Sequence, residues 1–309
     1  MITERIDAVT HIEPEYMKQV VPVPPSVKIE LTSRCNYRCG FCATSQKLRP
    51  KGDMDQRLYE MLVSELRNEG VKELGLFYLG ESFLCPWLPE AVHFAKTIGF
   101  PYVFLTTNGS LCTESKLKAV MGAGLDSLKF SFNYADEEQF KEIANVNSKN
   151  FKNAVKAVKL AYRARAVYGY KTKLYASYIK YDGEQAEKMK PILEEIKPYV
   201  DEIYALPLYD QGSYVNVKGI GKKTPGNVGR ADNMVDPLPC WAGFKEGHIT
   251  YDGKLAYCCF SHDDRFHIGD LKTTGFMQAW NSEKAKKLRR AHLDRDVSGT
   301  ECERCVILD

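Results

Sequence analysis

Residues 32–42 read Thr32-Ser33-Arg34-Cys35-Asn36-Tyr37-Arg38-Cys39-Gly40-Phe41-Cys42 and come directly after a strand-like apolar segment. Three thiols packed this closely along the chain are typical of metal ligands rather than disulfide partners. Soft sulfur ligands select iron-sulfur clusters or zinc. A tetrahedral zinc site or a fully protein-ligated cubane needs a fourth ligand, which this loop does not offer. A cluster bound here would therefore keep one corner open.

The CxxxCxxC spacing of these cysteines resembles that of the radical S-adenosylmethionine (SAM) superfamily. In that family, three cysteines hold a [4Fe-4S] cluster whose free iron chelates the amine and carboxylate of SAM. The resemblance makes Cys35, Cys39 and Cys42 the cluster ligands. Phe41 supplies the aromatic residue that usually precedes the third cysteine, next to the cofactor. The alternative is a zinc knuckle, or buried thiols that pack as small hydrophobic groups.

Length and composition favour a soluble α/β protein. The 309 residues are 44% hydrophobic, which is enough for one large domain and a small appendage. Residues 1–20 hold no apolar signal-peptide core, and no run of eighteen apolar residues occurs, so we expect a cytoplasmic protein without a membrane partner. A net charge of +3 does not require a nucleic-acid partner, which argues against a tRNA-modifying enzyme.

Strand-like and helical segments alternate along the chain. Helical periodicity is clearest over residues 53–67 and 150–165, with Asp53 and Asn150 as expected N-caps. This alternation predicts a parallel sheet, and its count matches the partial (βα)6 TIM-like barrel of the resembled superfamily. The six expected strands are residues 27–31, 74–79, 102–106, 128–132, 173–179 and 202–206.

The carboxyl ends of parallel strands form the reaction site of a barrel. The second strand ends in Tyr78-Leu79-Gly80-Glu81, which resembles the family's Gly-Gly-Glu segment with Leu79 in place of the first glycine. The resemblance implies that Gly80 and Glu81 receive the SAM ammonium group. Turn capping is the commoner use of polar residues at such positions. Further SAM contacts are implied for residues near the ends of later strands: Asn108, Ser131, Ser177 and Leu206.

A second group of cysteines lies near the carboxyl terminus: Cys240, Cys258, Cys302 and Cys305. Four thiolates form a closed set that suits either a structural zinc or a fully ligated cubane. The pattern Cys, gap, Gly253, four residues, Cys and final CxxC resembles the twitch domain, the short form of the SPASM extension. That resemblance implies an auxiliary [4Fe-4S] cluster, and hence two clusters in all.

These patterns divide the chain into four parts. We expect an N-terminal extension over residues 1–25, a radical SAM partial barrel over 26–215, a linker or flap over 216–236 and a twitch domain over 237–309. The linker contains a stretch rich in glycine, lysine and proline that lacks the setting of a dinucleotide fingerprint.

Cys259 is a spare thiol next to Cys258. A thiol hydrogen can be given to a carbon radical, so a cysteine facing the substrate can complete an epimerisation from the opposite face. The alternative role is a buried small residue. Cys85 is the second candidate donor, and further candidates to face the substrate are Tyr78, Tyr178, Tyr209, Asp210, Gln211 and Arg230. The polar residues His262, Asp263, Asp264 and His267 lack the spacing for one metal ion and are expected to form a loop.

The resemblance leaves several functions open. Twitch enzymes include a dehydrogenase and an epimerase of aminoglycoside pathways, and SPASM relatives modify peptides. We expect epimerisation of a small polar, aminoglycoside-like or sugar-like molecule, or oxidation of an alcohol carbon through the auxiliary cluster. Epimerisation or cross-linking of a ribosomal peptide and a non-catalytic role as a zinc-binding adaptor also stay open. An external electron donor such as flavodoxin or ferredoxin is also implied.

Overall fold

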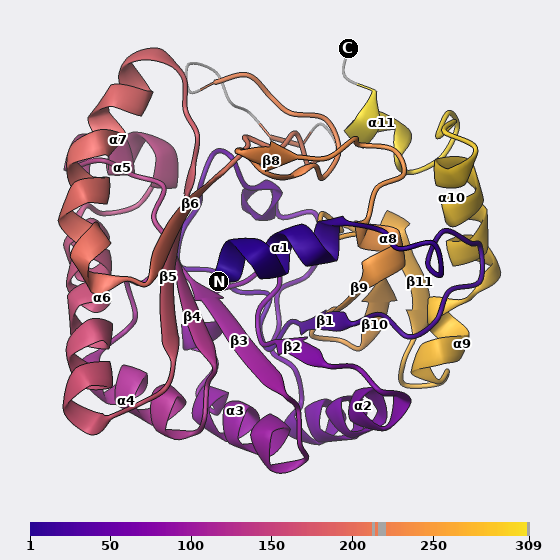
Figure 1. Ribbon diagram of the computed structural model, residues 1–309, viewed down its shortest axis with the longest axis horizontal. Coiled ribbons are helices and arrows are strands. Elements are labelled where there is room, and N and C mark those ends of the chain that lie inside the picture. Colours follow the sequence, from indigo (N-terminus) through magenta and orange to yellow (C-terminus); the bar gives the residue numbers. More distant parts are fainter. Residues whose placement is uncertain (212–213, 216–220, 308–309) are drawn as a thin grey trace.

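The computed structural model describes residues 1–309 except 212–213, 216–220 and 308–309 (Figure 1). One nine-stranded sheet runs through it in the order β11-β10-β9-β1-β2-β3-β4-β5-β6. Every pair from β1 to β6 is parallel, which confirms the α/β class and the order of six parallel strands. The second strand ends at Gly75, so residues 76–79 of the predicted strand lie beyond it. These strands are β1 (Ser26–Ile29), β2 (Glu73–Gly75), β3 (Tyr102–Thr107), β4 (Ser127–Ser131), β5 (Lys173–Ile179) and β6 (Glu202–Leu206).

Helices on the convex side of the sheet connect the parallel strands (Figure 1). Apolar residues of both layers form the core between them, for example Leu62 of α2 and Phe130 of β4, which are both almost fully buried. The helices are α2 (Gln56–Glu69), α3 (Leu88–Thr97), α4 (Glu114–Gly122), α5 (Glu137–Ala144), α6 (Lys149–Tyr168) and α7 (Gly183–Ile196). Short 3-10 turns are η1 (Ala43–Gln46), η2 (Ser82–Leu84) and η3 (Lys197–Tyr199).

Two predicted helix caps are wrong. Asp55, not Asp53, caps α2, because its side chain accepts a hydrogen bond of 3.0 Å from the Leu58 N–H. Asp53 lies in an isolated antiparallel bridge with Thr32, so the chain is still extended there. Asn150 lies inside α6, which starts at Lys149 after Ser148.

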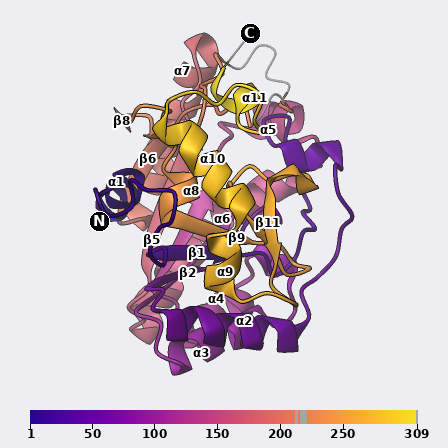
Figure 2. The ribbon, with the colours of Figure 1, turned by 90° about the vertical axis from the view of Figure 1, so that its right-hand side faces the viewer.

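The C-terminal part extends the same sheet beyond β1. β9 (Glu246–Ile249) runs parallel to β1, with Ser26 opposite Glu246 and Ile29 opposite Ile249. β10 (Lys254–Ala256) and β11 (His267–Asp270) follow in antiparallel order. The accompanying helices are α8 (Ala242–Lys245), α9 (Phe276–Trp280), α10 (Glu283–Leu293) and α11 (Glu303–Val306), with the turn η4 (Asp264–Phe266) (Figure 2). One continuous sheet therefore connects the part of the chain that carries the first cysteine group with the part that carries the second.

The N-terminal helix α1 (Ile2–Thr10) lies across the concave side of the sheet, near β6 and α8 (Figure 1). The Ile2 N–H donates to Glu202 Oε2 over 2.9 Å. Asp7 accepts two hydrogen bonds of 2.8 Å from Arg230 of the small hairpin β7 (Gly229–Arg230) and β8 (Asn233–Met234). The helix α1 is thus part of the wall around the barrel interior. Of the predicted linker, residues 216–220 lie outside the described residues.

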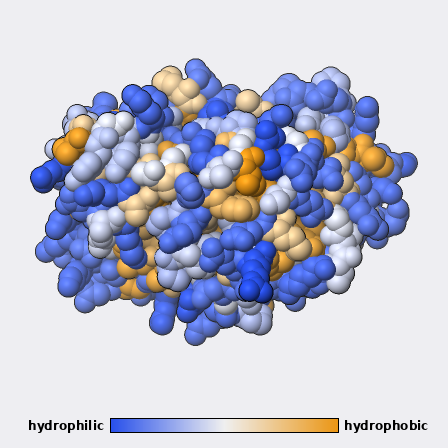
Figure 3. All heavy atoms as spheres, turned by 90° about the horizontal axis from the view of Figure 1, so that it is seen from below, coloured by the Kyte–Doolittle hydropathy of each residue, from blue (hydrophilic) through white to orange (hydrophobic). Residues whose placement is uncertain are grey.

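The face below the strands in Figure 1 is mostly hydrophilic, with small separate groups of apolar side chains (Figure 3). Among the described residues, no helix has the length and apolar character needed to cross a membrane.

Candidate active site

The first cysteine loop follows β1 and is fastened to the end of α5. The Arg38 N–H donates to the Ala144 carbonyl over 3.0 Å, and the Gly40 N–H donates to the Ile143 carbonyl over 2.9 Å. Burial raises the pKa of Cys35 to about 12, and burial followed by the neighbouring thiols raises the pKa of Cys39. Metal binding must therefore displace these protons.

The donor set of this loop fits a cluster with an open corner. Across the described ranges, no three His, Cys, Asp or Glu side chains converge closely enough to hold one metal ion. A cubane spreads its thiolates over separate iron atoms and does not need such a tight group. Cys35, Cys39 and Cys42 come from one loop, and the electrostatic effects of their thiols on one another place them in a single group. They are the residues that would hold the cluster.

Aromatic rings surround the loop. The Tyr134 hydroxyl oxygen, shortly after β4, lies 2.9 Å from Cys39 Sγ. The Tyr134 ring contacts Phe140 at a centroid distance of 4.7 Å and Phe41 at 6.5 Å. Phe41 is half-buried against this group, while Tyr134 is a neighbour that the sequence did not single out. The rings shield one side of the loop from water.

Gly80 lies against the backbone that leads into the cysteine loop. A Cβ atom on Gly80 would be 2.0 Å from the Thr32 carbonyl oxygen and 2.8 Å from that of Arg34. The adjacent Glu81 N–H donates to the Arg34 carbonyl over 2.8 Å. Only glycine allows this approach, so the segment after β2 and the backbone that leads into the cysteine loop are held in direct contact.

The Glu81 carboxylate is buried and already has several donors. Its Oε1 accepts from Thr107 Oγ1 over 2.8 Å, and its Oε2 accepts from the Asn108 N–H over 2.8 Å. Burial raises the pKa of Glu81, although these donors oppose the shift. Glu81 therefore ties the segment after β2 to the end of β3.

Asn108 continues this connection to the cysteine loop. Its Nδ2 donates to Asn36 Oδ1 over 2.9 Å, and Asn36 Nδ2 donates to Ser110 Oγ over 2.8 Å. Ser131 and Ser177 are register partners on β4 and β5. Of the other predicted cofactor residues, Ser131 and Leu206 end β4 and β6, Ser177 lies inside β5, and Leu206 also lines the cavity. Their contact with SAM stays a prediction.

The C-terminal cysteines also form a group. After burial, the Cys240 and Cys305 thiols raise the pKa of Cys302, and Cys240 also contributes to raising that of Cys305 to about 12. A hydrogen bond with Cys259 and burial are the main causes that raise the pKa of Cys258, and the Cys305 and Cys240 thiols add to the increase. All four predicted auxiliary ligands are therefore brought together, from the segments next to α8, β10 and α11.

Cys259 lies between this group and an internal cavity. It shares a hydrogen bond with the Cys258 thiol and accepts one of 3.0 Å from Asn227 Nδ2. Together with Trp241 and Phe260, Cys259 forms part of the cavity wall. A fifth thiol is thus placed beside the auxiliary group with access to the interior.

The cavity has a volume of about 260 Å³ and occupies the concave side of the sheet under α1. Charged side chains reach it from four strands: Lys28 of β1, Glu73 of β2, Lys129 of β4 and Glu246 of β9. Lys28 Nζ and Glu246 Oε1 form an ion pair of 2.7 Å. Sequence reasoning missed these residues, because a charge in a short strand gives no sign of facing inward.

Most of the predicted substrate-facing residues serve other contacts. Tyr209 lines the cavity, but its hydroxyl donates to the Gly229 carbonyl. Tyr78 donates to the Cys258 carbonyl over 2.6 Å, and Gln211 bonds to the backbone of Phe41. Arg230 is paired with Asp7 of α1. Asp210 forms an ion pair of 2.7 Å with Lys223, and the Cys85 thiol is buried outside the cavity wall.

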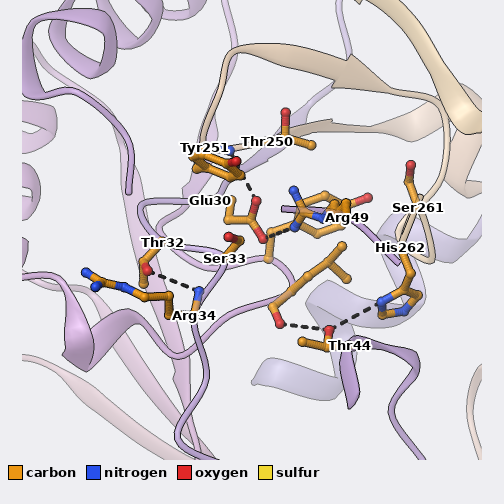
Figure 4. A network of polar contacts seen from close by, with 12 residues as sticks. Glu30, Thr32, Ser33, Arg34, Thr44, Arg49, Thr250, Tyr251, Ser261 and His262 are labelled. Carbon is orange, nitrogen blue, oxygen red and sulfur yellow. Dashed lines mark hydrogen bonds and ion pairs between the residues drawn. The ribbon is translucent and has the colours of Figure 1, made fainter. Parts of the chain in front are cut away.

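A polar network joins the first cysteine loop to the C-terminal part (Figure 4). Arg49 and Glu30 form a buried ion pair, and Glu30 Oε2 accepts from the Tyr251 N–H over 3.1 Å. Nearby, Thr44 Oγ1 lies 3.3 Å from His262 Nδ1 and donates to the Leu79 carbonyl over 3.1 Å. His262 therefore contacts Thr44 at this junction and lies in a polar loop.

Comparison with known proteins finds a family model for each of the two parts of the chain that carry cysteine groups. The radical SAM superfamily model matches residues 29–196, and the SPASM model, an iron-sulfur cluster-binding domain, matches residues 240–306. GTP 3',8-cyclase of Chlorobaculum tepidum is 36% identical over 118 residues, which cover 38% of this chain and only 35% of that protein. A probable GTP 3',8-cyclase of Sulfolobus acidocaldarius is 27% identical over 306 residues, with 86% of this chain and 90% of that protein covered.

Solved structures share the fold. BtrN in complex with AdoMet and 2-DOIA superposes with a TM-score of 0.60 at 17% identity and covers 92% of this chain and 93% of its own. Streptococcus suis SuiB bound to precursor peptide SuiA gives a TM-score of 0.65 at 13% identity, with 87% and 67% covered. These identities support a common architecture and say nothing further about substrate.

Proposed function

The chain belongs to the radical SAM superfamily, and from this premise we propose that it epimerises a carbon centre of a small polar molecule, with Cys259 as the hydrogen donor. It has a [4Fe-4S] cluster and SAM as cofactors, and its SPASM domain carries additional iron-sulfur chemistry. These cofactors supply a radical that removes a hydrogen atom from a substrate carbon. The protein's own residues bind and orient the substrate, exclude water and return a hydrogen atom.

The position of Cys259 in the cavity wall carries this proposal. Its S–H bond breaks and a C–H bond forms on the substrate radical, so the carbon is inverted and the sulfur is left as a thiyl radical. One electron and one proton restore the thiol, and a one-electron donor of the flavodoxin or ferredoxin class supplies the electron. The hydrogen bond from Asn227 Nδ2 keeps Cys259 Sγ oriented.

The small volume of the cavity favours a small molecule over a peptide. Its volume of about 260 Å³ lies just below the range of roughly 300–1,000 Å³ that is usual for small-ligand sites. The helix α1 covers the concave side, where an extended peptide would otherwise enter. We therefore assign the cavity to a compact substrate.

Dehydrogenation of an alcohol is the second candidate function, and Lys129 is the observation in its favour. Burial lowers the pKa of Lys129 to about 7, so its amine is able to accept a proton inside the cavity. In that reaction the substrate carbon loses a hydrogen atom, its hydroxyl group loses a proton to Lys129, and the remaining electron would pass to an auxiliary cluster of the SPASM domain, so no hydrogen comes from Cys259.

Deuterium incorporation separates the two functions. The reconstituted protein is incubated anaerobically in D₂O with SAM, reductant and a pool of small polar metabolites. An epimerase gives 5'-deoxyadenosine together with a product that carries one solvent deuterium at carbon, whereas a dehydrogenase gives a product lighter by two hydrogens. Cys259→Ala should still release 5'-deoxyadenosine but yield no deuterated epimer.

Matched variants control for loss of a cluster. Cys85→Ala removes a buried thiol outside the cavity wall and should leave the product unchanged. Cys259→Ala should keep the iron content of the wild type, whereas Cys258→Ala should lower it. A loss of iron in Cys259→Ala would make Cys259 a cluster ligand and overturn its role as donor.

A further inference from the structure

The cavity carries an excess of positive charge that the residues around it do not neutralise. Five charged side chains line it, three basic and two acidic: Arg5, Lys28, Lys129, Glu73 and Glu246. Arg5 is paired with Glu73, and Lys28 is paired with Glu246. Lys129 is the cation that remains.

Lys129 points into the cavity from the middle of β4. Its neighbours Leu128 and Phe130 face the opposite, fully buried side of the strand, as the alternation of a strand requires. No hydrogen bond or ion pair reaches its Nζ from the residues that the structure describes. The nearest ring is that of Tyr204, with its centroid 5.7 Å from Nζ.

Lys28 and Glu246 lie close enough to Lys129 to affect its charge. Lys28 disfavours the protonated form of Lys129 and Glu246 favours it, but Glu246 is already bonded to both Lys28 and His248, at 2.7 and 2.9 Å. Burial is the largest cause that lowers the pKa of Lys129. A buried lysine without an acidic partner is costly to a fold unless a ligand brings the partner.

We propose that the cavity binds a substrate that carries one anionic group, a carboxylate or a phosphate, held by Lys129 with Lys28 beside it. This assignment rests on the proposed function, in which the cavity holds the substrate. The aromatic rings that share the wall, among them Phe77 and Phe104, leave an apolar surface for the rest of the molecule. An aminoglycoside would instead add positive charge next to Lys129, so the pocket favours an acidic sugar over an amino sugar.

Thermal unfolding of the reconstituted full chain tests the proposal without turnover. Acetate and inorganic phosphate serve as probes, each compared with chloride at the same ionic strength near neutral pH. A ligand that binds only the folded state raises the unfolding midpoint. We expect one or both anions to raise the midpoint of the wild type more than that of Lys129→Met. Acetate acting alone would indicate a carboxylate, and phosphate alone a phosphate.

Lys173→Met is the matched control, because Lys173 is an exposed lysine of the neighbouring strand β5. It should respond to the anions as the wild type does, and general effects of phosphate on water should be common to all three proteins. An equal shift in the wild type and Lys129→Met would overturn the proposal.

A second measurement uses complete sugars. Binding of glucuronate, glucose and glucosamine is followed by calorimetry with SAM present and reductant absent. Wild type should prefer glucuronate over glucose, and Lys129→Met should lose that preference by about tenfold. Tighter binding of glucosamine than of glucuronate would overturn the proposal. Such a result would leave the epimerase proposal standing, because the latter depends on Cys259 and on deuterium in the product.

Discussion

The Tyr78 hydroxyl donates a hydrogen bond of 2.6 Å to the carbonyl oxygen of Cys258. Tyr78 lies in the segment that follows β2, two residues before Gly80, and Cys258 is a predicted auxiliary ligand. The Tyr78 ring also packs on His248 of β9, with centroids 5.1 Å apart. One side chain therefore joins the two cysteine groups through the continuous sheet.

Tyr78→Phe should lower the free energy of unfolding by about 0.5–1.5 kcal/mol, because the ring contacts stay and one buried hydrogen bond is lost. Denaturant unfolding measures this change. The same variant should lose iron from the auxiliary group faster under a chelator, since the Cys258 backbone is less firmly held. Tyr178→Phe is the control, because Tyr178 does not contact these cysteines. Equal chelation rates in all three proteins would contradict the prediction.

The contributions of Glu30 and Arg49 to the free energy of unfolding should be strongly coupled. Both side chains are 6% exposed or less, so removing one partner leaves an uncompensated charge. Arg49→Met and Glu30→Gln should each cost about 3–5 kcal/mol in the free energy of unfolding. The double variant should recover much of that loss, because no buried charge remains. Additive losses in a double-mutant cycle would show that the pair is not an interacting unit.

Gly80→Ala should disrupt the first cysteine loop. The new methyl group would meet the Thr32 carbonyl 2.0 Å away, so the backbone must shift. We expect a lower iron content and little cleavage of SAM. Gly122→Ala is the control: its nearest neighbour would be 3.5 Å away, and alanine in α4 should leave activity unchanged and add up to about 1 kcal/mol of stability. Normal iron content and cleavage in Gly80→Ala would contradict this prediction.

The fold and the cysteine groups were predictable from the sequence because each depends on a local pattern. The six strands are short apolar runs, and Cys35, Cys39 and Cys42 are fixed by spacing within one loop. The start of α2 was missed by two residues, because Asp53 and Asp55 are equally good caps and only the bridge from Thr32 to Asp53 separates them.

The residues that line the cavity were not predictable, because the lining depends on which face of each strand points inward. Lys28 and Glu246 are 218 residues apart in sequence and meet only because β9 adds to the sheet beside β1. The position of α1 in the cavity wall was not predictable for the same reason, because its partners Glu202 and Arg230 are distant in sequence. Long-range pairing of this kind leaves no local periodic signal.

The charge of Lys129 should make stability depend on pH. Burial, followed by Lys28, lowers the pKa of Lys129 in the folded state from 10.5 to about 7, whereas the unfolded chain keeps the ordinary value. Between these two values the unfolded state binds one proton more than the folded state, so this residue makes stability rise with pH across that window. Below about pH 7 the buried lysine destabilises the fold, by at most about 1.4 kcal/mol for each unit of the pKa difference.

Lys129→Met removes this dependence and should be more stable than the wild type near pH 7, with the difference shrinking as the pH approaches 10. Denaturant unfolding of both proteins at several pH values measures it, and Lys173→Met should follow the wild type. Parallel curves for the wild type and Lys129→Met would mean that Lys129 keeps an ordinary pKa. A bound acid should make the wild type more stable than Lys129→Met at neutral pH. Its negative charge favours protonated Lys129, so the lysine becomes stabilising.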